Sequence, residues 1–407
     1  MGCDSRVVPI ESTTATSSGP KTVSTAIPAS EPKVRVKLLR VTGGGHRVSI
    51  GDERQSLVVR GGGAEHPLTG PCTLVRSRGQ WVIRGVDIPT TIANARVVDF
   101  DSPTELTVRK KEGRRYEGII RCVADYDPPQ LNFDVINVVP MEQYIPGVLA
   151  GELYEGWHNA TFQAQAIAAR SFALSRCQQR SSKMWDVTDT ASSQMYIGVP
   201  PWDQAKDMAA ATRGEVIVWK GAVVPGYFSS CCGGRAATAT DAVGPNPVNA
   251  VPPLTGHQSP PYCTKAPRYR WSVTQSVASV SQAIRAWGKR TDQKDYVAIG
   301  EVISFTPITP NRHGRPTEIE VKSVGGTSIT IQCVDLPGVF WEANLPSLSS
   351  GWVGAEVKDG KLVMNGRGFG HGVGLCQYGA EAMAASAIPY QRIIEFYYPQ
   401  GTITKAW

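Results

Sequence analysis

Glu152 is a carboxylate whose position in the sequence suits acid–base chemistry. Tyr144, Val148 and Glu152 are spaced by four residues, so a helix over this segment carries them on one face. Glu152 therefore interrupts an apolar stripe that should be buried. In the following segment Arg170 interrupts a second apolar stripe, whose other members are Ala166, Ala169, Ala173, Leu174 and Cys177.

Burial of either charge alone costs several kcal/mol, so each side chain needs a partner or lines a cavity. Two interpretations are open. In the structural one, the two helices face each other and a buried Arg170–Glu152 salt bridge holds the hairpin together. In the functional one, Glu152 is a carboxylate in a cleft, and Arg170 orients it or the substrate. Glu155 is flanked by Tyr154 and Gly156 and is expected in solvent near the helix end.

A second group of polar side chains lies in a glycine-rich segment, GRGFGHGVGLCQYGA, at residues 366–380. Glycine loses more conformational entropy on folding than any other residue. The run therefore indicates either special backbone turns or a close approach of the backbone to another surface. Gly370 and Gly372 flank His371, and Gln377 and Tyr378 follow.

The elements that carry these residues form an α+β pattern. Short alternating apolar runs between residues 34 and 137, with glycine-rich breaks, predict antiparallel strands and hairpins. Residues 141–180 hold two helical patterns separated at residues 156–159. Strands return from residue 214 onward, and a closing helix is expected near residues 381–399. The order is not the regular βαβ alternation of a parallel sheet.

The expected regions are a leader at 1–33, a β-rich region at 34–137 and a catalytic region at 138–407. The leader is rich in Ser, Thr and Pro, which is typical of a flexible tether. Its Gly2-Cys3 start resembles a mature lipoprotein end and would place a lipid on Cys3; an arbitrary sequence boundary is the alternative.

Composition narrows the class of function. A composition of 19% charged and 41% apolar residues is typical of a globular protein. The formal net charge is +7 without a block of Lys and Arg, which argues against nucleic acid. The sequence contains no run of about 18 apolar residues, the length that would predict a membrane-spanning helix. Of the nine cysteines, an even number remains beside Cys3, which fits an oxidising, extracytoplasmic compartment such as the periplasm or cell envelope.

Two blocks resemble the SpoIID/LytB family of bacterial cell-wall proteins. They are IPGVLAGELYEGWHNATFQAQAIAARSFAL at residues 145–174 and GRGFGHGVGLCQYGAEAMA at residues 366–384, in the family's order. A lone glycine-rich loop is weak evidence, whereas two long ordered blocks are strong. The resemblance implies a SpoIID-like α+β fold in which a β-rich N-terminal region, a helical hairpin and antiparallel strands form a substrate cleft.

The activity implied by the resemblance is that of a lytic transglycosylase acting on peptidoglycan strands stripped of peptides, without a cofactor. The family's catalytic acid falls on Glu152. The residues expected to bind the glycan are Arg170, His371, Gln377, Tyr378, Gly370 and Gly372. For His371 the alternative is a structural histidine that braces the loop. A direct salt bridge would favour ionised Glu152 over the acid, so Arg170 is expected to bind substrate or hold the loop.

The sequence departs from the family at its cysteines. Thr188 and Ser193 stand where some members have zinc-binding cysteines, and hydroxyls do not replace thiolates as ligands, so no metal is expected there. Cys376 stands where the family often has Ser and is expected to be inert. Cys263 follows Cys231 and Cys232 across a proline-rich loop, and a disulfide of Cys263 with one of them, preferably Cys232, is expected.

Two rival functions are kept beside the enzyme. One is a non-catalytic glycan-binding protein that enhances a cell-wall amidase, a role also implied by the family. The other is a conventional hydrolase that pairs Glu152 with Glu155 or Asp189, because most glycosidases use two carboxylates.

Overall fold

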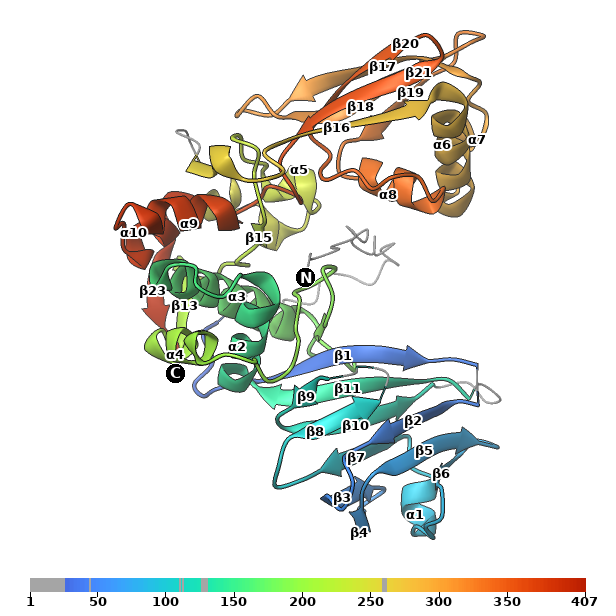
Figure 1. Ribbon diagram of the computed structural model, residues 1–407, viewed down its shortest axis with the longest axis vertical. Coiled ribbons are helices and arrows are strands. Elements are labelled where there is room, and N and C mark those ends of the chain that lie inside the picture. The colour runs from blue at the N-terminus through green and yellow to red at the C-terminus, as the bar shows by residue number, and fades with distance from the viewer. Residues whose placement is uncertain (1–25, 44, 110, 112, 126–130, 258–261) are drawn as a thin grey trace. The chain divides into compact units, whose positions relative to one another are not determined.

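A computed structural model describes residues 26–407 apart from residues 44, 110, 112, 126–130 and 258–261. The expected leader, with Cys3, therefore lies largely outside the described residues. The described residues form two compact units (Figure 1). The N-terminal unit comprises residues 26–156, 173–215 and 405–407, and the C-terminal unit comprises residues 157–172 and 216–404.

The N-terminal unit is built on two sheets. One has the strand order β12-β1-β11-β10-β7-β3-β4 and the other the order β6-β5-β2-β8-β9. Alternation of apolar and polar residues forms these strands: in β1, Val34, Val36 and Leu38 point inward and are buried. The strands are β1 Lys33–Val41, β2 Arg47–Ile50, β3 Ser56–Gly61, β4 Ala64–Thr69, β5 Cys72–Ser77, β6 Gln80–Ile83, β7 Val97–Asp101, β8 Leu106–Arg109, β9 Arg115–Tyr116, β10 Ile119–Ala124, β11 Phe133–Pro140 and β12 Val187–Thr188.

The helices of this unit are α1 (Thr90–Ala93), α2 (Met141–Glu152) and α4 (Asp203–Ala211). β11 runs directly into α2, with Pro140 as the N-cap residue of the helix. The boundary expected at residue 137 thus falls inside β11. The long helix α3 (Asn159–Gln179) contributes its residues up to Phe172 to the C-terminal unit and the rest to the N-terminal unit.

The C-terminal unit contains a helix-covered pair of sheets, with strand orders β16-β21-β20 and β17-β18-β19 (Figure 1). Helix α6 (Val277–Thr291) buries Val277, Val280, Ile284 and Trp287, the spacing of one helix face, against these strands and α8. The remaining bounds are α7 Lys294–Val297, α8 Leu336–Glu342, β16 Arg270–Ser276, β17 Val302–Pro310, β18 Pro316–Ser323, β19 Ser328–Gln332, β20 Val353–Lys358 and β21 Lys361–Arg367.

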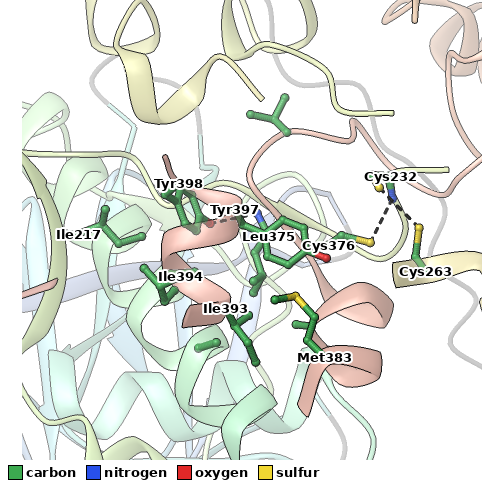
Figure 2. Close-up of a cluster of buried hydrophobic side chains, with 14 of the residues drawn as sticks. Ile217, Cys232, Cys263, Leu375, Cys376, Met383, Ile393, Ile394, Tyr397 and Tyr398 are labelled. Carbon is green, nitrogen blue, oxygen red and sulfur yellow. Dashed lines mark hydrogen bonds between the residues drawn. The ribbon is translucent and has the colours of Figure 1, made fainter. Parts of the chain in front are cut away.

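A second core of this unit surrounds the glycine-rich segment. Buried residues of α3, β13, β22, α9 and α10 meet there, among them Ile217, Leu375, Met383, Ile393 and Tyr397 (Figure 2). Its elements are β13 Glu215–Trp219, β14 Ala222–Val223, β15 Phe228–Ser229, α5 Ala239–Ala242, η1 Pro247–Asn249, η2 Pro252–Leu254, η3 Tyr262–Lys265, β22 Leu375–Cys376, α9 Gln377–Ala385, α10 Tyr390–Tyr397 and β23 Thr402–Lys405.

The α+β class is confirmed by this mixture of helices and antiparallel strands. The expected closing helix is two helices, because Pro389 restarts the chain as the N-cap residue of α10. In the described part of the chain no helix is long and apolar enough to cross a membrane.

Candidate functional site

Glu152 is the last residue of α2, and its helix lies directly on the loop of residues 194–198. Gly147 and Gly151, one helical turn apart, make this approach: a Cβ on Gly147 would lie 2.1 Å from the Gly198 carbonyl oxygen, and one on Gly151 would lie 2.3 Å from the Met195 oxygen. No larger residue fits either position without moving the loop.

The loop is fixed to α2 by buried aromatic residues. The Tyr144 hydroxyl donates to Gln194 Oε1 at 2.9 Å, and its ring packs on Tyr196 with centroids 4.9 Å apart. The Tyr196 hydroxyl donates to Asn137 Oδ1 of β11 at 2.9 Å. All four side chains are buried, so the hydrogen bonds between them are costly to break.

This loop orients the Glu152 carboxylate. The Met195 N–H donates to Glu152 Oε1 at 2.7 Å, a charge-assisted hydrogen bond when the group is ionised. Tyr144 and Val148 of the predicted stripe are fully buried, whereas Glu152 is half-buried at the edge of the apolar face. Glu155 is exposed, as expected.

Asp189, in the same unit, forms ion pairs with two basic side chains. It is buried and pairs with Lys111 Nζ at 2.7 Å and with Arg114 Nη1 at 3.2 Å. Burial raises the pKa of Asp189 above its usual range, although the two cations oppose the change. A carboxylate held by two cations is a poor second catalytic group, so the geometry disfavours the hydrolase that uses Asp189.

Hydroxyl groups bind one another at the positions compared with the family's zinc loop. Thr188 Oγ1 lies 2.7 Å from Ser192 Oγ and 3.1 Å from Thr190 Oγ1, and Ser193 Oγ accepts from the Thr188 N–H at 3.1 Å. These contacts tie the loop together through neutral oxygens.

Arg170 lies in the C-terminal unit and is fully buried, although its residue type favours solvent. Its Nη1 donates to the Ala166 carbonyl oxygen at 3.4 Å within α3. The next residue, Ser171, accepts from the Ile217 N–H at 2.8 Å and so joins α3 to β13. Of the two expected roles, burial favours Arg170 as a residue that holds its surroundings over one that contacts a glycan.

The glycines of the 366–380 segment serve turns against the protein's own chain. Gly370 and Gly372 have φ values of +94° and +76°, a region that side chains disfavour. The Gly370 N–H donates to the Ser349 carbonyl oxygen at 2.8 Å, and the Gly372 N–H donates to Ser229 Oγ at 3.2 Å. Of the two interpretations of the glycine run, the structure supports special turns.

His371 forms hydrogen bonds with two backbone groups. Its Nδ1 accepts from the Val373 N–H at 3.0 Å, and it also hydrogen-bonds the Phe228 backbone. Burial, with the positive charge of Arg315, lowers the pKa of His371 to about 4. The imidazole is therefore neutral at physiological pH, and its two backbone hydrogen bonds are compatible with the alternative of a structural histidine.

Tyr378 and Trp157 form an aromatic pair, with centroids 5.1 Å apart in an edge-to-face arrangement. Both are partly exposed, whereas Gln377, the first residue of α9, is buried. Trp157 is not among the candidate site residues that the sequence predicts, because there it marks only the break between two helices.

Glu381 of α9 fixes the start of α3 beside this pair. Its Oε2 accepts from the His158 N–H at 3.1 Å and from Thr161 Oγ1 at 2.7 Å. Its Oε1 lies 2.7 Å from His158 Nδ1. The carboxylate thus satisfies groups at the N-terminus of α3, where a negative charge is favourable.

The pair expected as a disulfide is brought together. Cys232 Sγ and Cys263 Sγ lie 3.5 Å apart with both thiols free, and Cys376 lies beside them (Figure 2). The disulfide stays a prediction.

Comparison with known proteins places part of the chain in a family. Residues 130–219, which include Glu152 and Arg170, match the stage II sporulation protein model, SpoIID. The sequence resemblance is thereby confirmed. Residues 259–374, which include His371, match a domain of unknown function, DUF8618, while Gln377 and Tyr378 lie outside both SpoIID and DUF8618.

Relatives extend the likeness beyond the SpoIID segment. An uncharacterized protein of Brachyspira hyodysenteriae is 30% identical over 266 residues, 65% of this chain and 66% of that protein. The amidase enhancer of Bacillus subtilis is 24% identical over 297 residues, 64% of this chain and 40% of its own length. Stage II sporulation protein D of Bacillus subtilis is 27% identical over 284 residues, which are 66% of this chain and 75% of that protein. The chain spans less than two thirds of the length of the Brachyspira protein and of the amidase enhancer.

Proposed function

We propose that this chain is a lytic transglycosylase that cleaves the bond between N-acetylmuramic acid and N-acetylglucosamine in peptidoglycan, with Glu152 as the catalytic acid. The observation that carries the proposal is the SpoIID match over residues 130–219, which include Glu152, a carboxylate that accepts a hydrogen bond from the Met195 N–H.

A single carboxyl group suffices for this reaction. Glu152 donates its proton to the glycosidic oxygen, and the bond from that oxygen to C1 of the muramic acid breaks. The 6-hydroxyl oxygen of the same sugar attacks C1, and its proton passes to the Glu152 carboxylate, which is then ready for another cycle. The intramolecular attack replaces the water and the second carboxylate of a hydrolase. Asp189 forms ion pairs with Lys111 and Arg114, which agrees with a reaction that needs only one carboxyl group.

The C-terminal unit supplies surfaces suited to sugar. Trp157 and Tyr378 present partly exposed aromatic rings, which offer an apolar face together with a polar group. We assign glycan contact to this pair and positioning roles to His371, Arg170, Gly370 and Gly372. Gln377 is assigned to the turn into α9, because it is buried.

The test is a digest of purified peptidoglycan, with and without prior removal of the peptides by an amidase, analysed by mass spectrometry. Wild-type protein should release anhydro products that are lighter by one water than hydrolysis products, most abundantly from stripped strands. Glu152→Gln should abolish them, whereas Glu155→Gln, which alters an exposed carboxylate nearby, should not. Products that carry a reducing end, or full activity of Glu152→Gln, would show that the assignment is wrong.

A second function is favoured by one relative, whose name is amidase enhancer. In that case the chain binds glycan and raises the activity of a partner amidase without cleaving the strand. Intact glycan with both wild-type protein and Glu152→Gln, together with binding by both and faster peptide release by an added cell-wall amidase, would select this function. Either function places the chain outside the cytoplasm, and a lipid on Cys3 is a proposal for its attachment.

A further inference from the structure

Four buried cysteines converge in the second core of the C-terminal unit. They are Cys231 and Cys232 after β15, Cys263 in η3, and Cys376 at the end of β22. The Sγ atoms of Cys231, Cys263 and Cys376 all lie within 4.8 Å of one another. Cys232 Sγ lies outside this set of three but is 3.5 Å from Cys263 Sγ (Figure 2).

Three of the sulfur atoms are close enough together to bind one metal ion, and Cys232 is near enough to Cys263 to be a fourth ligand. In a tetrahedral Zn²⁺ site with Zn–S bonds of about 2.3 Å, neighbouring sulfur atoms are about 3.8 Å apart. The Cys232–Cys263 distance of 3.5 Å is close to this value and far from the bond length of about 2.05 Å in a disulfide. A disulfide between these two residues would also leave the thiols of Cys231 and Cys376 facing it without a role.

The surroundings of the cluster suit thiolates. The Gly233 N–H points to Cys231 Sγ at 3.4 Å, and the Cys232 N–H points to Cys376 Sγ at 3.3 Å. Gly233 has a φ of +72°, and a Cβ there would lie 2.8 Å from the Arg367 carbonyl carbon, so this turn depends on glycine. Backbone N–H groups aimed at sulfur stabilise its negative charge and orient the ligands.

A buried cation faces the same cluster. Arg315 is 5% exposed, and its Nη1 donates to the Cys232 carbonyl oxygen at 3.2 Å. In the described part of the chain, the groups that favour its charge are the thiols of Cys232, Cys333 and Cys231 rather than a carboxylate. A guanidinium without a carboxylate partner is costly to bury, and four thiolates around a divalent ion carry a net charge of opposite sign.

We propose that Cys231, Cys232, Cys263 and Cys376 bind one structural Zn²⁺. Each thiol loses its proton to solvent on binding, so four sulfur anions and one divalent cation leave a site of net negative charge beside Arg315. Soft thiolate ligands favour zinc over magnesium or calcium, which prefer oxygen. This site differs in position from the residue 188–193 loop, where the chain has hydroxyls.

The ion would join the segments that carry the glycine-rich loop. Cys231 pairs with Phe369 through two backbone hydrogen bonds, of 3.1 and 2.8 Å, and the Tyr378 N–H donates to the Ser230 oxygen at 3.1 Å. Cys376 immediately precedes Gln377 and Tyr378. The zinc would therefore hold the start of α9 against the residue 230–234 turn and η3, and so fix Tyr378.

The first experiment measures zinc in the full chain purified in reducing buffer without chelator. Elemental mass spectrometry should find about one zinc per chain. Cys376→Ser should lose most of the metal. Cys333→Ser, which alters a buried cysteine of the other core of the same unit, should keep it. Wild-type content far below one zinc with reduced thiols, equal content in Cys376→Ser, or iron in place of zinc would overturn the proposal.

The second experiment does not depend on a variant that folds. Metal-free, reduced wild-type chain is titrated with Co²⁺, which reports four sulfur ligands by visible absorption, and then with Zn²⁺, which should displace it. Peptide mapping with blocked thiols is carried out in parallel. No cobalt spectrum, or a Cys232–Cys263 disulfide in the purified protein, would refute the zinc site and favour the disulfide expected from the sequence. Neither outcome bears on Glu152, so the proposed reaction is tested separately.

Discussion

Substitution of Gly151 by Ala tests whether the close approach of α2 to the residue 194–198 loop positions Glu152. The added methyl group would lie 2.3 Å from the Met195 carbonyl oxygen and 2.9 Å from its carbonyl carbon. These are backbone atoms, which cannot swing away as the end of a side chain can. The helix and the loop must therefore separate, and the Met195 N–H moves from Glu152 Oε1.

The size of the effect follows from three terms. Overpacking of this kind costs about 1–3 kcal/mol. Loss of a hydrogen bond to a charged group costs about 1.5 kcal/mol, the low end of its range, because Glu152 is half-buried. Alanine in a helix recovers about 1 kcal/mol relative to glycine. The net loss of unfolding free energy should be about 1.5–3.5 kcal/mol.

Urea denaturation followed by circular dichroism measures this loss. The control is Gly354→Ala in β20, where the added Cβ meets its nearest atom at 3.8 Å and the backbone is not left-handed, so stability should hardly change. Anhydro-product release by Gly151→Ala should also fall, because its Glu152 is displaced. Unchanged or increased stability of Gly151→Ala would show that the loop yields without cost, and the reasoning would fail.

Three further predictions concern the C-terminal unit. Because the pKa of His371 is lowered to about 4, the unfolded chain takes up a proton below about pH 6.5 before the folded chain does. The contribution of His371 to the free energy of unfolding is therefore complete above pH 6.5 and decreases toward pH 4. Denaturation of wild type and His371→Asn at both pH values should show that the variant loses about 1–3 kcal/mol less on acidification. An identical pH dependence in the variant would contradict the burial of a neutral imidazole. Trp157→Ala should weaken glycan binding in a pull-down assay by about 0.5–1.5 kcal/mol, through loss of its pairing with Tyr378; undiminished binding would remove the pair from the glycan surface. Glu381→Ala should lower stability by about 1–2 kcal/mol by leaving the start of α3 without its acceptor, whereas Glu395→Ala, which removes an exposed ion pair, should have little effect; equal effects would show that the Glu381 contacts are not specific.

Local patterns predicted many elements correctly. The alternating runs that begin at Val34, Arg47 and Ser56 are strands, and the four-residue spacing of Tyr144 and Val148 gives a buried helix face. Helix α6 went unpredicted, although Ser276 caps it and its apolar spacing is regular. The sequence pattern predicts one closing helix, whereas Pro389 begins a separate helix, α10, after the end of α9.

The sequence by itself determined the α+β class and the resemblance to SpoIID, and it indicated Glu152 as the candidate acid, because these depend on motifs and on periodicity along the chain. Tertiary structure decided what the neighbouring residues do. His371 and the glycines around it face their own backbone, and Arg170 is fully buried. The convergence of Cys376 with Cys231, Cys232 and Cys263 was also decided there. Contacts between residues more than a hundred positions apart depend on packing, which no local pattern encodes.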